Sequence, residues 1–145
     1  MKKLTTKLTI AAATLVVVAG AAWTQTQSTL KAVIPFEFRA GGKVMAPGTY
    51  QVNASQTGSG PIYQLSNVHA RSSIMLLPQA PVDPAKAWKA EGNPKLAFAC
   101  TGGSCSLAEI WDGSGDYAYT FHRPKRGGDE EASLRVIPMQ RDKSE

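Results

Sequence analysis

Apolar and polar residues alternate along short runs of this chain, and Gly, Pro, Asn and Ser residues separate the runs. The clearest run is 31–40, whose alternate positions form two sets: Ala32, Ile34, Phe36 and Phe38 in one, and Val33, Pro35, Glu37 and Arg39 in the other. This period of two predicts a half-buried β-strand. Pro35 has no amide hydrogen to donate to a sheet ladder, so it indicates a sheet edge or a bulge at that point.

The same chemistry recurs along the rest of the chain, with turns such as Gly41-Gly42 between the runs. One short helix is expected at Pro84–Glu91, with Asp83 as its N-cap and Gly92 at its end. About seven to nine short strands with frequent turns predict an all-β fold, either an antiparallel β-sandwich or a small β-barrel. After 31–40, strands are expected at 49–52, 62–65, 71–77, 95–100, 105–111, 117–121 and 134–137.

The first 22 residues have the layout of a secretory signal peptide. Lys2, Lys3 and Lys7 precede an apolar run at 8–22, and Ala19-Gly20-Ala21 has the small-x-small pattern that signal peptidase accepts. The apolar run has about fifteen residues, fewer than the ~20 that span a bilayer, although a retained anchor is the alternative. The expected organisation is a cleaved signal peptide at 1–22, a single all-β domain at 23–139 and a flexible tail at 140–145, in a protein exported to the periplasm or out of the cell.

Composition and charge narrow the class of protein further. A chain of 145 residues with 43% hydrophobic and 19% charged residues fits one globular domain and excludes a disordered tail or a coiled coil. The formal charge of +5 suggests a nucleic-acid partner, but residues 1–22 hold three lysines and no acid, which leaves +2 after export. The basic run at 122–126 is followed by acids at 129–131. The sequence therefore predicts no nucleic-acid binding and no membrane span in the mature chain.

Two blocks of sequence resemble a known family. The first is Ile34-Pro35-Phe36-Glu37-Phe38, followed by Gly41-Gly42-Lys43 and by Ala46-Pro47-Gly48-Thr49-Tyr50, and the second is Leu107-Ala108-Glu109-Ile110-Trp111. The pattern resembles small secreted bacterial proteins of unknown function that share an IPFxF…GGKxxPAGTY opening. The resemblance covers roughly residues 31–121. It implies an exported, mostly β domain and carries over no catalytic residues.

The two cysteines, Cys100 and Cys105, flank the four residues at 101–104. If the runs on either side pair as a hairpin, the cysteines lie opposite each other and within reach of a disulfide bond. Export to an oxidising compartment favours that bond over free thiols. A redox site would favour Cys-x-x-Cys, and a metal site would need further ligands, for which only His69 and His122 offer imidazoles.

The segment Asp112-Gly113-Ser114-Gly115-Asp116 places oxygen ligands at alternate positions, as the start of a calcium-binding loop does. The later positions fail, because Tyr117 stands where the loop needs Gly and Arg123 stands where it needs Glu. A solvated hairpin turn is the simpler interpretation. The sequence therefore predicts no metal and no cofactor.

Four aromatic residues are candidates for stacking against a sugar ring: Trp88, Trp111, Tyr117 and Tyr119. Even spacing places Trp111 on the same strand face as Leu107 and Glu109. The competing interpretation is that these aromatics belong to the core.

No motif for catalysis accompanies the β pattern. His69 and His122 stand outside any triad pattern, and Glu37 and Glu109 could form a glycosidase-like pair but fit solvent-exposed strand faces. The first hypothesis is an exported, non-enzymatic β-domain with a binding or envelope-associated role. The alternatives are a carbohydrate-binding module and a small hydrolase or isomerase. The candidate partners are a glycan and an envelope component.

Overall fold

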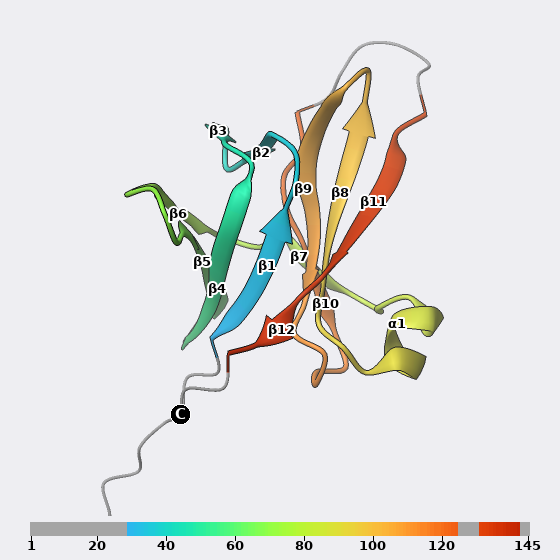
Figure 1. Ribbon diagram of the computed structural model, residues 1–145. Helices are drawn as coiled ribbons and strands as arrows, with labels where there is room; N and C mark the ends of the chain where they lie inside the picture. The colour runs from blue at the N-terminus through green and yellow to red at the C-terminus, as the bar shows by residue number, and fades with distance from the viewer. Residues whose placement is uncertain (1–28, 125–130, 143–145) are drawn as a thin grey trace, which may run out of the picture.

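The computed structural model describes residues 29–124 and 131–142, and these form two β-sheets packed face to face (Figure 1). The predicted signal peptide at 1–22 lies outside the described residues. The all-β prediction is confirmed. The first sheet, sheet A, has the order β12-β1-β4-β5-β6, all antiparallel. Its strands are β12 (Gln140–Arg141), β1 (Leu30–Ile34), β4 (Gly48–Thr57), β5 (Gly60–Asn67) and β6 (Ser73–Leu76).

The second sheet, sheet B, has the order β11-β8-β9-β10-β7. A hairpin of β2 and β3 joins it beside the first half of β9, and the β2–β9 pair is parallel. Every other pair in this sheet is antiparallel. Its strands are β11 (Ser133–Pro138), β8 (Lys95–Thr101), β9 (Ser104–Trp111), β10 (Ala118–Thr120), β7 (Ala80–Val82), β2 (Phe38–Ala40) and β3 (Lys43–Met45).

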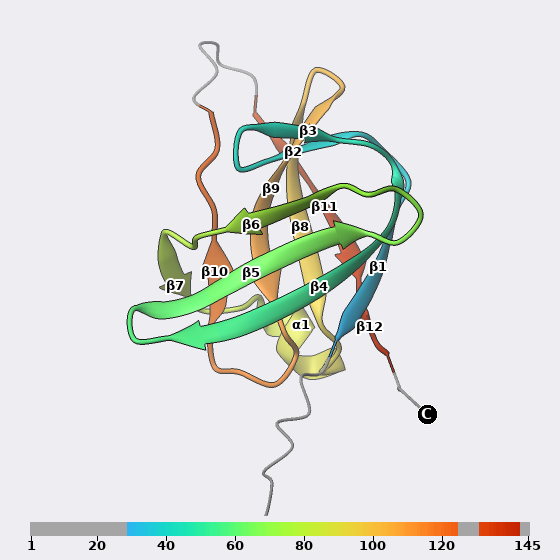
Figure 2. The same cartoon turned by 90° about the vertical axis from the view of Figure 1, so that its left-hand side faces the viewer.

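The chain passes from one sheet to the other at four places, between β1 and β2, between β3 and β4, between β6 and β7, and between β11 and β12. The strands of sheet A run across those of sheet B, as Figure 2 shows. This is the arrangement of a sandwich whose sheets are not aligned. Alternate residues of both sheets point inward and form one main core, which includes Ile34, Tyr50 and Leu65 from sheet A and Phe98 and Ile110 from sheet B.

The first predicted strand, 31–40, divides into two strands that lie in different sheets. β1 ends at Ile34 and β2 begins at Phe38, so the break falls at Pro35. The predicted irregularity at Pro35 is therefore a change of sheet, because the missing amide hydrogen ends the pairing with β4. The predicted alternation still holds, since Ala32, Ile34 and Phe38 are all buried.

Three aromatic residues of the segment 34–50, Phe36, Phe38 and Tyr50, pack in the main core. The ring of Phe98 packs edge-on against Phe36 and Phe38, with centroid distances of 5.1 Å and 5.2 Å. Phe38 in turn packs edge-on against Tyr50, and the hydroxyl of Tyr50 donates a hydrogen bond to the carbonyl oxygen of Ala46. A tyrosine that bonds back to the backbone a few residues upstream is a recurrent device of β-sandwiches. The aromatic residues of the segment 34–50 therefore have a structural role.

A short helix, α1 (Lys86–Glu91), lies on the outer face of sheet B and covers a second, smaller core. It starts two residues later than predicted. Its N-cap is Ala85, which makes no side-chain cap, so the predicted cap at Asp83 is wrong. Ala85 has an extended conformation and the helix begins directly after it. Asp83 therefore lies two residues before the cap position. Gly92 ends the helix in the left-handed region as predicted, and an ion pair joins Glu91 to the buried Lys95 of β8.

A β-bulge at Ala108 changes the faces that the sequence predicts for β9. Ala97 pairs with Glu109 but Phe98 pairs with Leu107, so one residue of β9 is extra. Beyond the bulge the inside and outside faces exchange. Leu107 therefore points into the main core while Trp111 packs in the second core, and the prediction that they share a face is wrong.

Residues 140–142 continue the fold, whereas the sequence predicts a flexible tail at 140–145. Gln140 and Arg141 form β12 beside β1, and Asp142 forms an ion pair with Lys31 at 2.9 Å. The buried Met139 connects β11 of sheet B to β12 of sheet A. The sequence does not predict β12, because its residues are polar and an edge strand needs no apolar side chains. Residues 143–145 lie outside the described residues.

The predicted disulfide between Cys100 and Cys105 is present. The two residues are direct partners in the β8–β9 hairpin, with Cα atoms 4.0 Å apart. Gly102 and Gly103 make the turn with φ angles of 57° and 80°, which are costly for residues with a side chain. The bond therefore closes a hairpin whose geometry the two glycines already favour.

Reduction of this disulfide is expected to lower the free energy of unfolding by about 2 kcal/mol, because the closed loop is short. Urea unfolding with and without reductant measures the difference. A variant with Cys100→Ala and Cys105→Ala is the control and should respond equally in both conditions. An intact mass that does not rise by two hydrogen atoms on reduction would contradict the bond.

Candidate functional site

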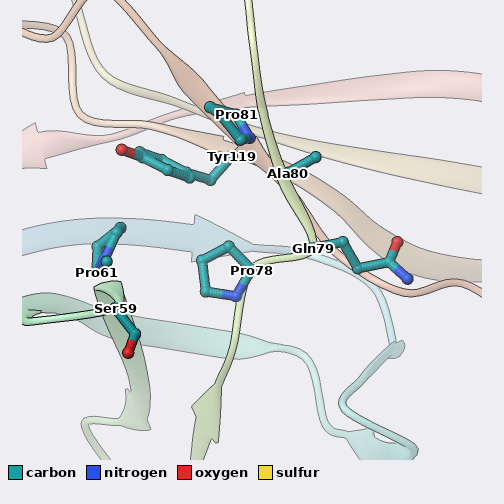
Figure 3. A pocket seen from close by; sticks show the side chains of 8 residues that line it. Ser59, Pro61, Pro78, Gln79, Ala80, Pro81 and Tyr119 are labelled. Atoms are coloured by element: carbon teal, nitrogen blue, oxygen red, sulfur yellow. The ribbon is translucent and has the colours of Figure 1, made fainter.

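A cavity of about 280 Å³ opens on the side of the sandwich where the chain crosses from β6 to β7. Three separate stretches of chain form it: the β4–β5 turn, the β6–β7 connection with β7, and Tyr119 of β10. Figure 3 shows the ring of Tyr119 and the rings of Pro61 and Pro78 around one space. The eight lining residues are Ser59, Gly60, Pro61, Pro78, Gln79, Ala80, Pro81 and Tyr119.

Hydrogen bonds hold one wall of the cavity against β10. The backbone amide of Gln79 donates to the carbonyl oxygen of Thr120 at 2.8 Å, and the hydroxyl of Thr120 donates to the carbonyl oxygen of Ala80 at 3.1 Å. The side-chain amide nitrogen of Gln79 lies 3.2 Å from Nδ1 of His122. Three prolines further restrict the backbone of the lining. The site is therefore largely formed before any ligand arrives.

The lining is uncharged and mostly apolar. Tyr119 presents a half-buried ring that packs against the buried Tyr63, with centroids 6.0 Å apart. Burial raises the pKa of Tyr63 above its ordinary value of 10.0, and the negative charge of Asp112 raises it further. Tyr63 therefore stays a neutral phenol behind the cavity. The eight lining residues supply hydroxyl and amide groups but no carboxylate, amine, imidazole or thiol.

The structure separates the four aromatic candidates. Trp88 of α1 and Trp111 of β9 stack on each other, with ring centroids 6.5 Å apart, and are 7% and 3% exposed. The indole nitrogen of Trp111 donates to the carbonyl oxygen of Gly115. Tyr117 is 54% exposed on the turn before β10, outside the cavity lining. Tyr119 alone of the four lines the cavity.

The turn at 112–116 uses its first carboxylate internally. Oδ1 of Asp112 accepts hydrogen bonds from the backbone amides of Ser114 and Gly115 at 3.0 Å and 2.9 Å. This arrangement is an Asx turn, which matches the solvated-turn interpretation. Across residues 29–124 and 131–142, no three His, Cys, Asp or Glu side chains lie close enough together to hold a metal ion. The same residues contain no helix that is long and apolar enough to cross a membrane.

None of the acid–base candidates lines the cavity, although His122 contacts the lining residue Gln79. His69 is exposed on the β5–β6 turn, where its backbone amide donates to the side chain of Asn67. His122 is exposed, and its Nδ1 lies 3.2 Å from the side-chain amide nitrogen of Gln79. Glu37 is exposed between β1 and β2, whereas Glu109 is half-buried on β9, where burial raises its pKa.

Replacement of Glu109 by Gln is expected to stabilise the protein near pH 7. The pKa of Glu109 is raised in the folded state, so the folded protein holds this proton more tightly than the unfolded chain does. The contribution of Glu109 to wild-type stability therefore falls as the pH rises from the ordinary pKa of 4.5 through the higher folded-state pKa. Urea unfolding should show a more stable E109Q protein at about pH 7 and no difference at about pH 4. An E109Q protein that is less stable at neutral pH would contradict this account.

The sequence pattern predicts only a small part of the cavity lining. The sequence places strand ends at Pro61, Pro78 and Pro81. Of the lining residues, it predicts a binding role only for Tyr119. The residues converge from positions about 60 apart, and the crossing from sheet A to sheet B that unites them depends on tertiary packing. Three prolines at strand ends were the available signal, but prolines at strand ends are common.

No protein-family model, curated protein or solved structure matches this chain. The functional assignment therefore depends on the geometry of the cavity and on the chemistry of its lining.

Proposed function

We propose that this chain is an exported, non-enzymatic binding protein and that its binding site is the cavity at Tyr119. Two features support export: a signal-type sequence at 1–22 and a disulfide, which persists in oxidising compartments. One observation carries the binding role: a largely pre-formed, mostly apolar cavity with a few polar groups at its rim, which is the usual form of a small-molecule site.

The chemistry of the lining favours a neutral sugar ring as the ligand. The flat ring of Tyr119 offers an apolar face for the C–H groups of a pyranose, and Ser59 and Gln79 offer hydroxyl and amide groups for its hydroxyls. A charged ligand would find no counter-charge among the lining residues. The volume of about 280 Å³ is near the lower end of small-molecule sites, so we expect one ring inside the cavity and any further sugar units outside it.

A glycan array tests this proposal with three proteins: wild type, Tyr119→Ala and Tyr117→Ala. Wild type and the Tyr117→Ala control should bind the same neutral glycans, and Tyr119→Ala should lose at least about tenfold in affinity, or about 1.4 kcal/mol. Because Tyr119 also packs on Tyr63, a Gln79→Ala variant at the exposed rim serves as a second test and should weaken the same binding. Binding that survives in both site variants, or that is lost only in Tyr117→Ala, would place the site elsewhere.

A further inference from the structure

The edge strand β6 is exposed and uncharged. It pairs with β5 on one side only and therefore ends sheet A. Figure 1 shows it at the left, on the outside of the molecule. The side chain of Met75 is 68% exposed, and that of Leu77, just after the strand, is 73% exposed. Such an edge presents unpaired backbone N–H and C=O groups that another strand can pair with.

The other edge strands that the structure describes carry the usual protection against such pairing. β11 contains Arg135 and Pro138, and the three-residue strands β7 and β3 contain Pro81 and Lys43. β12 has only two residues, one of which is Arg141. Charges, prolines and short length all oppose edge-to-edge pairing. Among these edges β6 alone has four residues with neither a charge nor a proline.

Packing against the β2–β3 turn holds β6 in place. Leu76 is 3% exposed, and Ile74 is half-buried against the same core. A Cβ atom on Gly41 of that turn would lie 2.9 Å from Cδ1 of Ile74 and 3.0 Å from Cδ2 of Leu76. The inward side of β6 is therefore fixed by close contacts, so a partner strand would meet an edge that is already in strand geometry.

We infer that β6 pairs with β6 of a second copy of this chain, which makes a two-fold symmetric dimer with one continuous sheet. Antiparallel pairing of identical edges places each segment against itself, so a charged edge would repel its own copy. The segment Ser73–Leu77 holds no charge, and the outer face beside it is also uncharged. On the two neighbouring strands that face consists of Thr49, Gln51, Asn53, Ser55, Ile62, Gln64 and Ser66. Pairing also covers the exposed Met75 and Leu77.

The interface is small, so the dimer is reversible. Sedimentation equilibrium on the purified protein should show a monomer–dimer equilibrium with a Kd on the order of 10–100 μM. Met75→Lys should raise that Kd at least about tenfold, because it places like charges across the two-fold axis. The matched control is Val33→Lys, which adds the same charge at an exposed aliphatic residue of β1 and should leave the Kd unchanged. A monomer up to about 1 mM, or a dimer that tolerates Met75→Lys, would overturn the inference.

Cross-linking tests the same contact without relying on a disruptive substitution. The chain contains two cysteines, both in the disulfide, so an introduced cysteine is a single free thiol. Oxidation of Met75→Cys should give a covalent dimer, whereas oxidation of Val33→Cys should give mostly monomer. Equal cross-linking at the two positions would show random collision and would overturn the inference. This result is independent of sugar binding, which the Tyr119 variants report separately.

Discussion

Replacement of Phe98 by Ala is expected to lower the free energy of unfolding by about 3–5 kcal/mol. Phe98 is fully buried in β8 and packs edge-on against Phe36 and Phe38, so its truncation leaves a cavity at the centre of the main core. Single domains are stable by only about 5–15 kcal/mol, so this loss is a large fraction of the total. Urea unfolding followed by circular dichroism gives the value.

The control for this prediction is Tyr117→Ala, which removes a ring of similar size from an exposed turn. It should change the free energy of unfolding by no more than about 0.5 kcal/mol. If both variants lose similar stability, the aromatic cluster around Phe98 is not the centre of the core, and the structural role given to the aromatic residues of the segment 34–50 is wrong.

Replacement of Trp88 by Ala is expected to cost about 3 kcal/mol and to undock α1. A helix of six residues is not stable alone, so α1 depends on the contact between Trp88 and Trp111 and on the Glu91–Lys95 ion pair. Loss of the stacked indole pair should also weaken the near-ultraviolet circular dichroism signal. At the same time Trp111 becomes exposed, so its fluorescence should shift to longer wavelength.

Trp88→Phe is the matched variant, because it keeps an aromatic ring over Trp111. It should retain most of the stability and keep the fluorescence of Trp111 near its wild-type wavelength. A Trp88→Ala protein with unchanged stability and unchanged fluorescence would show that α1 does not cover Trp111 in solution.

The sequence predicted those parts of the fold that depend on local chemistry. Alternation identified the buried positions of β1 and β2, the Gly41-Gly42 pair marked a hairpin turn, and the spacing of Cys100 and Cys105 predicted the disulfide. Each of these depends on residues within about ten positions of one another. Local pattern is sufficient there because strand period and turn geometry are set by neighbouring residues.

The parts that were missed depend on packing between distant segments. Pro35 indicates a break in the strand, but no neighbouring residue indicates that the chain then joins the other sheet. The bulge at Ala108 exchanged the faces of Leu107 and Trp111, because one extra residue reverses every later position of a strand. The cavity also depends on distant segments, because Pro61, Pro78 and Tyr119 meet only after both sheets have formed.

The central proposal is that the cavity at Tyr119 binds a neutral sugar ring, and an amide-resolved NMR titration tests it most directly. The probes are soluble cello-, xylo- and chito-oligosaccharides, added one at a time to the ¹⁵N-labelled protein. The account predicts that at least one of them shifts the amide signals of Gly60, Gln79, Ala80 and Tyr119 while the signals of α1 stay in place. Shifts confined to α1 or to the outer face of sheet A, or no shift with any probe, would contradict it.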